Sequence, residues 1–230
     1  MTRNRSPGPV PRRRLYAVAA LAPVLALGIL LLPGRERLRA AGPANTGHAE
    51  LACAQCHTPA DGTVRQQVQA NVRQLVGLRE SGADFLHKPV GNADCVACHR
   101  NEDDRHPVYR FNEPRFQEAR EAIAPQYCVS CHVEHSGKRV TAEPTLCVSC
   151  HADMEIREDP IEPTHAQLAL LEEWASCLGC HDFHGNHVRT TPVSFDRVLS
   201  LIEVRSYLDG GPPIYGRELR YPARTERAKP

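Results

Sequence analysis

The stretch CLGCHDFHGNH, Cys177–His187, carries two cysteines and three histidines within eleven residues. Two residues separate the cysteines, and a histidine follows the second one directly. Thiolate and imidazole are both good metal ligands. The stretch therefore either binds a metal ion itself or carries a cofactor that already contains one, and the rest of the chain distinguishes the two.

Every cysteine of the 230-residue chain belongs to a copy of this C-x-x-C-H pattern. The ten cysteines are Cys53, Cys56, Cys95, Cys98, Cys128, Cys131, Cys147, Cys150, Cys177 and Cys180. The histidines that follow the five pairs are His57, His99, His132, His151 and His181. Because the chain has only 12 histidines, five such neighbours do not arise by chance, and the histidine is part of the motif.

Three chemistries use a C-x-x-C pair. A redox-active dithiol is expected once, on a βαβ scaffold, and needs no adjacent histidine. A structural zinc site needs four ligands and normally joins two such pairs. Attachment of c-type haem needs this arrangement, because the thiols bond the porphyrin and the imidazole binds its iron. Five complete motifs favour covalent haem.

On these five motifs the chain resembles the multihaem c-type cytochromes, in particular the small electron carriers of the c3 and c554 type. The resemblance implies five covalently bound haem c groups, with the ten cysteines as attachment points and the five motif histidines as proximal iron ligands. It also implies a mostly α-helical and irregular fold wrapped around a haem array. Uneven motif spacings of 42, 33, 19 and 30 residues exclude a strict repeat.

Seven histidines lie outside the motifs and are candidates for the second axial position on each iron. They are His48, His87, His106, His135, His165, His184 and His187. The C-x-x-C-H-x-x-H form of CVSCHVEH and CLGCHDFH is similar to that of small multihaem carriers, in which the second histidine binds a neighbouring haem. His106, in a loop beside two aspartates, and His187 are less well placed, and Met154 is a weaker alternative ligand.

The N-terminus predicts a membrane anchor. Five arginines precede an uncharged, largely apolar run from Leu15 to Leu32, which is 18 residues long. No small-residue cleavage site follows closely, so a retained helix is preferred to a cleaved signal peptide. The expected layout is a basic cytoplasmic segment 1–14, an anchor 15–32, a linker 33–47, a pentahaem domain 48–187 in the periplasm, and a C-terminal helix and tail 188–230.

The charge of the exported part limits its partners. Residues 43–230 contain 20 basic and 26 acidic residues, a net charge of −6. Such a surface disfavours nucleic acid, and we expect redox proteins or subunits of a respiratory complex as partners, with membrane quinol as a further possibility.

Hydrophobic periodicity predicts a few short helices. A stripe from Val64 to Val76 is expected to pack on the first or second haem, or to bind a partner. Two more helices are expected over 113–123 and 166–176. A fourth is expected within 194–208, either packed on the haem domain or docking a partner, followed by a disordered tail, TERAKP.

The sequence favours an electron carrier that is not an enzyme, with low-potential bis-histidine haems and no catalytic side chain. A pentahaem nitrite reductase is disfavoured, since such enzymes carry a C-x-x-C-K motif and are much longer. An anchored quinol dehydrogenase that feeds a periplasmic reductase is the nearer alternative, although CAQCHTPADG lacks the methionine expected near its quinol-side haem. A third possibility is an electron-transfer subunit of a larger respiratory complex.

Overall fold

In a computed structural model, the protein is described over residues 12–32 and 34–225. The chain divides into two units, of which the first ends at Ala41 and the second begins at Gly42. The first unit contains helix α1 (Arg12–Leu31), with Pro23 inside it, and a 3-10 turn, η1 (Glu36–Arg39). Residues 1–11 of the expected basic segment lie outside the described residues.

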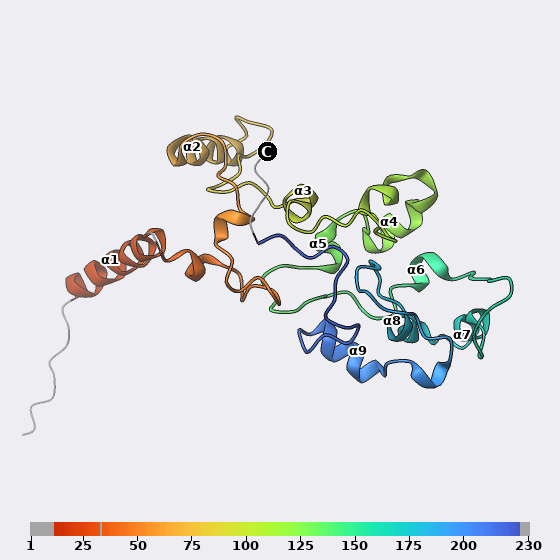
Figure 1. Cartoon of the computed structure of the whole chain (residues 1–230). Helices are drawn as coiled ribbons and strands as arrows, with labels where there is room; N and C mark the ends of the chain where they lie inside the picture. Colours follow the sequence, from red (N-terminus) through yellow and green to blue (C-terminus); the bar gives the residue numbers. More distant parts are fainter. Residues whose placement is uncertain (1–11, 33, 226–230) are drawn as a thin grey trace, which may run out of the picture. The chain divides into compact units, whose positions relative to one another are not determined.

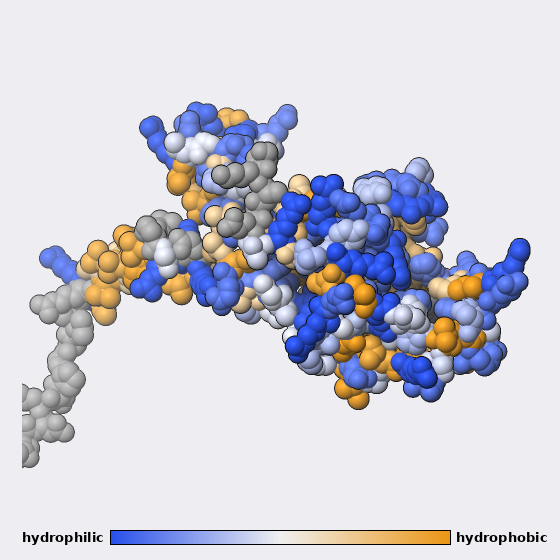
Figure 2. All heavy atoms as spheres, viewed as in Figure 1, coloured by the Kyte–Doolittle hydropathy of each residue, from blue (hydrophilic) through white to orange (hydrophobic). Residues whose placement is uncertain are grey.

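Most apolar side chains of α1 are exposed to solvent, and Figure 2 shows the helix surface as largely apolar. Within the ranges that the structure describes, no helix is both long enough and apolar enough to cross a membrane.

The second unit is built from short helices joined by irregular loops (Figure 1). Its α-helices are α2 (Val64–Leu75), α3 (Asn92–Val96), α4 (Gln117–Ile123), α5 (Cys128–Cys131), α6 (Val148–His151), α7 (His165–Leu170), α8 (Cys177–Cys180) and α9 (Leu201–Leu208). Its 3-10 turns are η2 (Cys53–Gln55), η3 (Val108–Asn112), η4 (Pro114–Phe116), η5 (Trp174–Ser176) and η6 (Phe195–Arg197). The described part of the chain has isolated β-bridges but no strand, so the prediction of a mostly helical and irregular fold is confirmed.

Each of the five C-x-x-C-H motifs closes into one helical turn. The backbone N–H of the motif histidine donates to the carbonyl of the first cysteine, at 2.7 to 3.0 Å in every copy. This is the i to i+4 bond of an α-helix, which brings residues four apart onto one face. The first thiol and the imidazole therefore lie on the same side of each turn, as one bound group would require.

Helix α2 begins where the sequence predicts a helix, but the face that it buries is not the predicted apolar stripe. Thr63 and Gln66 form a capping box at its start, and the chain leaves the helix before Gly77, which has a φ of +76°. The buried residues are Gln67 and Ala70, whereas Val68 and Val72 of the apolar stripe are about half exposed. Packing of this stripe on a haem stays a prediction.

A polar side chain explains why α2 turns this way. The Gln67 amide donates to the carbonyls of Asp61 and Gly62, at 3.3 and 3.2 Å, and its oxygen accepts from the backbone N–H of Leu86 at 3.0 Å. Asn71 likewise bonds both backbone groups of Ala83. These bonds stabilise the polar face of α2 against the neighbouring loops, because buried amides need partners.

The helices predicted over 113–123 and 166–176 are shorter than expected. In the first range, the 3-10 turn η4 precedes α4. In the second, α7 ends at Leu170 and η5 follows, because Glu172 adopts a left-handed conformation with a φ of +59°. A residue in that region terminates an α-helix, so the continuous pattern overestimates helix length.

The C-terminal helix packs on the last motif. Leu178 of α8 and Val204 and Leu208 of α9 form the buried apolar cluster, in which Val204 is fully enclosed. Helices α8 and α9 lie side by side in Figure 1. The helix is shorter than the predicted range 194–208, because the Ser200 and Glu203 capping box starts it only at Leu201.

Gly179 permits this packing, since a Cβ there would lie 2.5 Å from a methyl group of Val198 and 2.6 Å from the Leu199 carbonyl. Only a residue without a side chain allows that approach. Residues 218–224 then return along the unit: Val188 N–H donates to Glu218, and Arg224 N–H donates to the Cys98 carbonyl. Of the predicted disordered tail, residues 226–230 lie outside the described residues.

Candidate functional site: paired histidines at the C-x-x-C-H motifs

Every motif histidine faces a histidine from outside the motifs. The ring-centre distances are 5.8 Å for His99 and His48, 6.1 Å for His132 and His184, 6.3 Å for His151 and His106, 6.3 Å for His181 and His165, and 5.7 and 6.1 Å for His57 with His87 and His135. The partners come from distant parts of the sequence, so the pairing is a property of the fold.

These distances fit two imidazoles that bind one iron from opposite sides. Metal–imidazole bonds of about 2 Å on each side would place the two ring centres roughly 6 Å apart. Rings in direct hydrogen-bonding contact would lie closer together. The ring-centre distance of each pair therefore matches the distance that two imidazoles on one metal ion would have.

His57 has two neighbours, His87 and His135, so six of the seven non-motif histidines face a motif histidine. His87 forms an isolated β-bridge with Pro59, which lies two residues after the first motif. His135 belongs to the CVSCHVEH stretch of the third motif and has a φ of +61°. Its ring thus faces a different motif from the one that precedes it.

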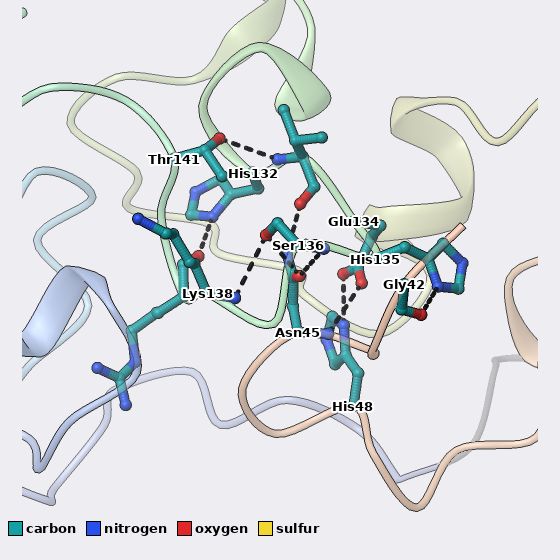
Figure 3. A network of polar contacts seen from close by, with 11 residues as sticks. Gly42, Asn45, His48, His132, Glu134, His135, Ser136, Lys138 and Thr141 are labelled. Carbon is teal, nitrogen blue, oxygen red and sulfur yellow. Dashed lines mark hydrogen bonds and ion pairs between the residues drawn. The ribbon is translucent and has the colours of Figure 1, made fainter. Parts of the chain in front are cut away.

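Loop 42–48 and loop 132–141 are joined by the polar network in Figure 3, which positions two of these rings. Buried Asn45 donates to the Val133 carbonyl at 3.0 Å and accepts from the Ser136 N–H at 3.1 Å. Across the same junction, the Nδ1 atom of His48 lies 2.5 Å from Glu134. The Nδ1 atom of His135 lies 3.2 Å from the Gly42 carbonyl.

Two further carboxylates contact non-motif histidines that face a motif histidine. Both carboxylate oxygens of Asp104 lie 3.1 Å from the Nδ1 atom of His184. Asp159 lies 2.9 and 3.0 Å from Nδ1 of His165 and also accepts its backbone N–H at 2.7 Å. An acceptor at Nδ1 fixes the tautomer and leaves Nε2 as the free ligand atom, which is the usual arrangement of metal-binding histidines.

His106 is held differently, although it too faces a motif histidine. Its Nδ1 atom lies 2.6 Å from the Phe183 carbonyl, and the Phe183 ring stacks on it at 4.2 Å. Its backbone N–H donates to Asp104. The ring that faces His151 is that of His106. Met154, the alternative ligand considered from the sequence, follows His151 by three residues in the chain.

Among the described residues, His187 is the one non-motif histidine whose ring does not pair with that of a motif histidine. Its Nδ1 atom lies 2.7 Å from Asp182, and Tyr215 is its aromatic neighbour at 5.3 Å. The backbone N–H of His187 donates to the same carboxylate. His187 thus supports the loop after the fifth motif.

Burial favours the neutral imidazole at the motifs. It lowers the pKa values of His57, His99, His132 and His181 in the chain without cofactor. A neutral ring keeps the lone pair that a metal needs. For His184 burial opposes protonation, but the hydrogen bond and charge of Asp104 outweigh it and raise the pKa.

The cysteines of different motifs also meet. The thiols of Cys95 and Cys128 are close enough to shift each other's pKa, and so are those of Cys147 and Cys177. None of the ten cysteines forms a disulfide, and helix α3 lies beside α5. Cysteines of the second and third motifs, and of the fourth and fifth, are therefore adjacent.

The donor set fits covalent haem. Each motif offers two thiols outside any disulfide and an imidazole on one helical turn, and a second imidazole lies at a ring-centre distance that an iron between the two would require. Over residues 12–32 and 34–225, no three His, Cys, Asp or Glu side chains converge as they would around a bare metal ion. Sequence reasoning could not assign Glu134 to His48 or Asp104 to His184, because these partners lie 86 and 80 residues apart in the chain.

Comparison with known proteins gives one match. Residues 44–152 match the family model described as cytochrome c3. This range contains the first four motifs, and the fifth lies beyond it. No curated protein and no solved structure matches the chain. The family match supports a multihaem electron-transfer cytochrome with covalently bound haem c.

Proposed function

We propose that the protein is a pentahaem c-type cytochrome that carries electrons through five bis-histidine haems. The observation that supports this most strongly is the set of histidine pairs, with ring centres 5.7 to 6.3 Å apart at all five motifs. When attached, haem c supplies one-electron oxidation and reduction at its iron.

The pairs assign the axial ligands. His99 and His48 would hold the second haem, His132 and His184 the third, His151 and His106 the fourth, and His181 and His165 the fifth. For the first haem we propose His57 and His135. The ring of His135 has its Nδ1 atom fixed by the Gly42 carbonyl, which is typical of metal-binding histidines.

This assignment predicts different results for alanine at the two neighbours of His57. His135→Ala should produce one high-spin haem, because the first iron loses an axial ligand. His87→Ala should leave all five haems low-spin. Electron paramagnetic resonance of the oxidised proteins measures both, and the opposite pattern would assign His87 to the first haem.

Two imidazoles on every iron would leave no coordination position for a substrate. The side chains at the motifs then act as ligands and positioning groups, and none serves as a general acid, base or nucleophile. Adjacent thiols, such as Cys95 with Cys128, support close spacing of the attached groups. This favours a carrier over an enzyme that binds a small molecule.

We further propose that residues 15–32 anchor the protein in the cytoplasmic membrane, with the haem-binding part in the periplasm. The proposal rests on the uncharged apolar run and the arginines that precede it. An anchored carrier stays close to its redox partners, which raises their effective concentration. The net charge of −6 on residues 43–230 favours partners with basic or neutral surfaces.

A reductive titration of the purified full-length protein tests the proposed function. Five haems per chain should be found by mass, and full reduction should take up five electrons. Uptake of fewer electrons, or a mass with fewer than five haems, would contradict it. Oxidation of a quinol analogue by the isolated protein would instead favour the quinol dehydrogenase, whereas dependence on another subunit would favour a plain carrier.

A further inference from the structure

The non-motif histidines that face the motifs differ in the acceptor at Nδ1. His48, His165 and His184 contact the carboxylates of Glu134, Asp159 and Asp104. His106 and His135 contact backbone carbonyls instead. The acceptors at Nδ1 thus fall into a charged group and a neutral group.

The three carboxylates are poorly exposed, which strengthens their effect. The exposed fraction of the side chain is 8% for Asp159, 17% for Asp104 and 34% for Glu134. A charge that is partly removed from water acts on its neighbours with less screening. A carboxylate at Nδ1 also makes the imidazole a stronger electron donor through Nε2 than a carbonyl does.

We propose that Glu134, Asp104 and Asp159 lower the reduction potentials of the second, third and fifth haems, respectively. A more basic axial ligand and a nearby negative charge both stabilise the oxidised iron, which carries one more positive charge than the reduced iron. The inference rests on the proposed function, because it needs the histidines to be iron ligands. The three carboxylates are positioning and tuning residues, since they act through the ring that they contact.

At the fifth motif, cations oppose this effect. Arg105 and Arg189 are close enough to His181 to help lower its pKa, after burial and His165. Arg189 also has a buried Nη1 atom for which no protein partner is recorded in the described residues. The arginines reduce the net effect of the surrounding charge on the fifth haem, but the shift on neutralising Asp159 keeps its sign.

The test uses Glu134→Gln, Asp104→Asn and Asp159→Asn in the full-length holoprotein. Each amide keeps an oxygen that can accept from Nδ1 and removes only the charge. Glu143→Gln is the matched control, because Glu143 is exposed and pairs with Arg205, and the change in net charge is the same. Redox titrations followed by electron paramagnetic resonance give the midpoint potential of each low-spin haem.

Each test variant should move one midpoint potential to a more positive value, and a different haem in each variant, whereas the control should move none. Unchanged potentials in all three variants, with five low-spin haems retained, would overturn the tuning role. A high-spin signal in a variant would overturn it too, because the carboxylate would then only hold the ring in place. Absence of five haems or of low-spin iron in the unmodified protein would instead contradict the proposed function.

Discussion

Replacing His184 with alanine should convert one haem in five from low-spin to high-spin, at the third motif and not at the fifth. The reason is that His184 follows the fifth motif in the chain, but its ring centre lies 6.1 Å from that of His132. The third iron would lose its second imidazole, while His181 would keep His165. Electron paramagnetic resonance of the oxidised variant measures the change.

The same loop offers the control. His187 lies three residues after His184. His187→Ala should leave all five haems low-spin, because His187 contacts Asp182 and Tyr215 instead of a motif histidine. To locate the affected haem, His184→Ala is combined with Cys128→Ser and Cys131→Ser, which remove the third haem. The high-spin signal should then disappear. A signal that persists in this background would place His184 on another iron and contradict the pairing.

Removing all five haems should abolish cooperative folding of residues 42–225. The buried apolar side chains of the described chain are few, and three of them are alanines: Ala60, Ala70, Phe111, Ala119, Leu178, Val204, Leu208 and Tyr215. So small a core cannot offset the conformational entropy of a chain of this length, and covalent cofactors must supply the rest. Many large apolar side chains of residues 42–225, such as Leu75, Tyr109 and Leu170, are exposed instead of buried.

A variant with serine at all ten cysteines tests this expectation. It should show no cooperative thermal transition by circular dichroism and should be digested rapidly by protease. The matched variant, Cys177→Ser with Cys180→Ser, should keep four haems and a cooperative transition, with weaker packing of α9 on α8. A cooperative transition in the haem-free chain would show that the polypeptide folds without its cofactors.

Local pattern made the motifs predictable. Five copies of C-x-x-C-H predict the attachment points, and each copy forms one helical turn because its hydrogen bond connects residues only four apart. The supply of second ligands could be counted as well, since seven histidines remain outside the motifs. Predicting these features does not require the contacts between distant segments of the chain.

The pairing of the histidines could not be predicted, because it depends on contacts between distant loops. The position of His48, which faces His99, depends on Asn45 and Glu134, because these residues join loop 42–48 to loop 132–141 (Figure 3). Likewise, the orientation of α2 follows from the hydrogen bonds of Gln67 and Asn71. The spacing of apolar residues does not predict these bonds. Tertiary contacts decide both.

The most direct test of the central claim is the electron paramagnetic resonance spectrum of the oxidised full-length protein, with haem quantified on the same sample. Bis-histidine ligation predicts five low-spin haems per chain and no high-spin signal. A stoichiometric high-spin signal would mean that one iron lacks its second imidazole. That result would contradict the account of the protein as a carrier with every axial position filled.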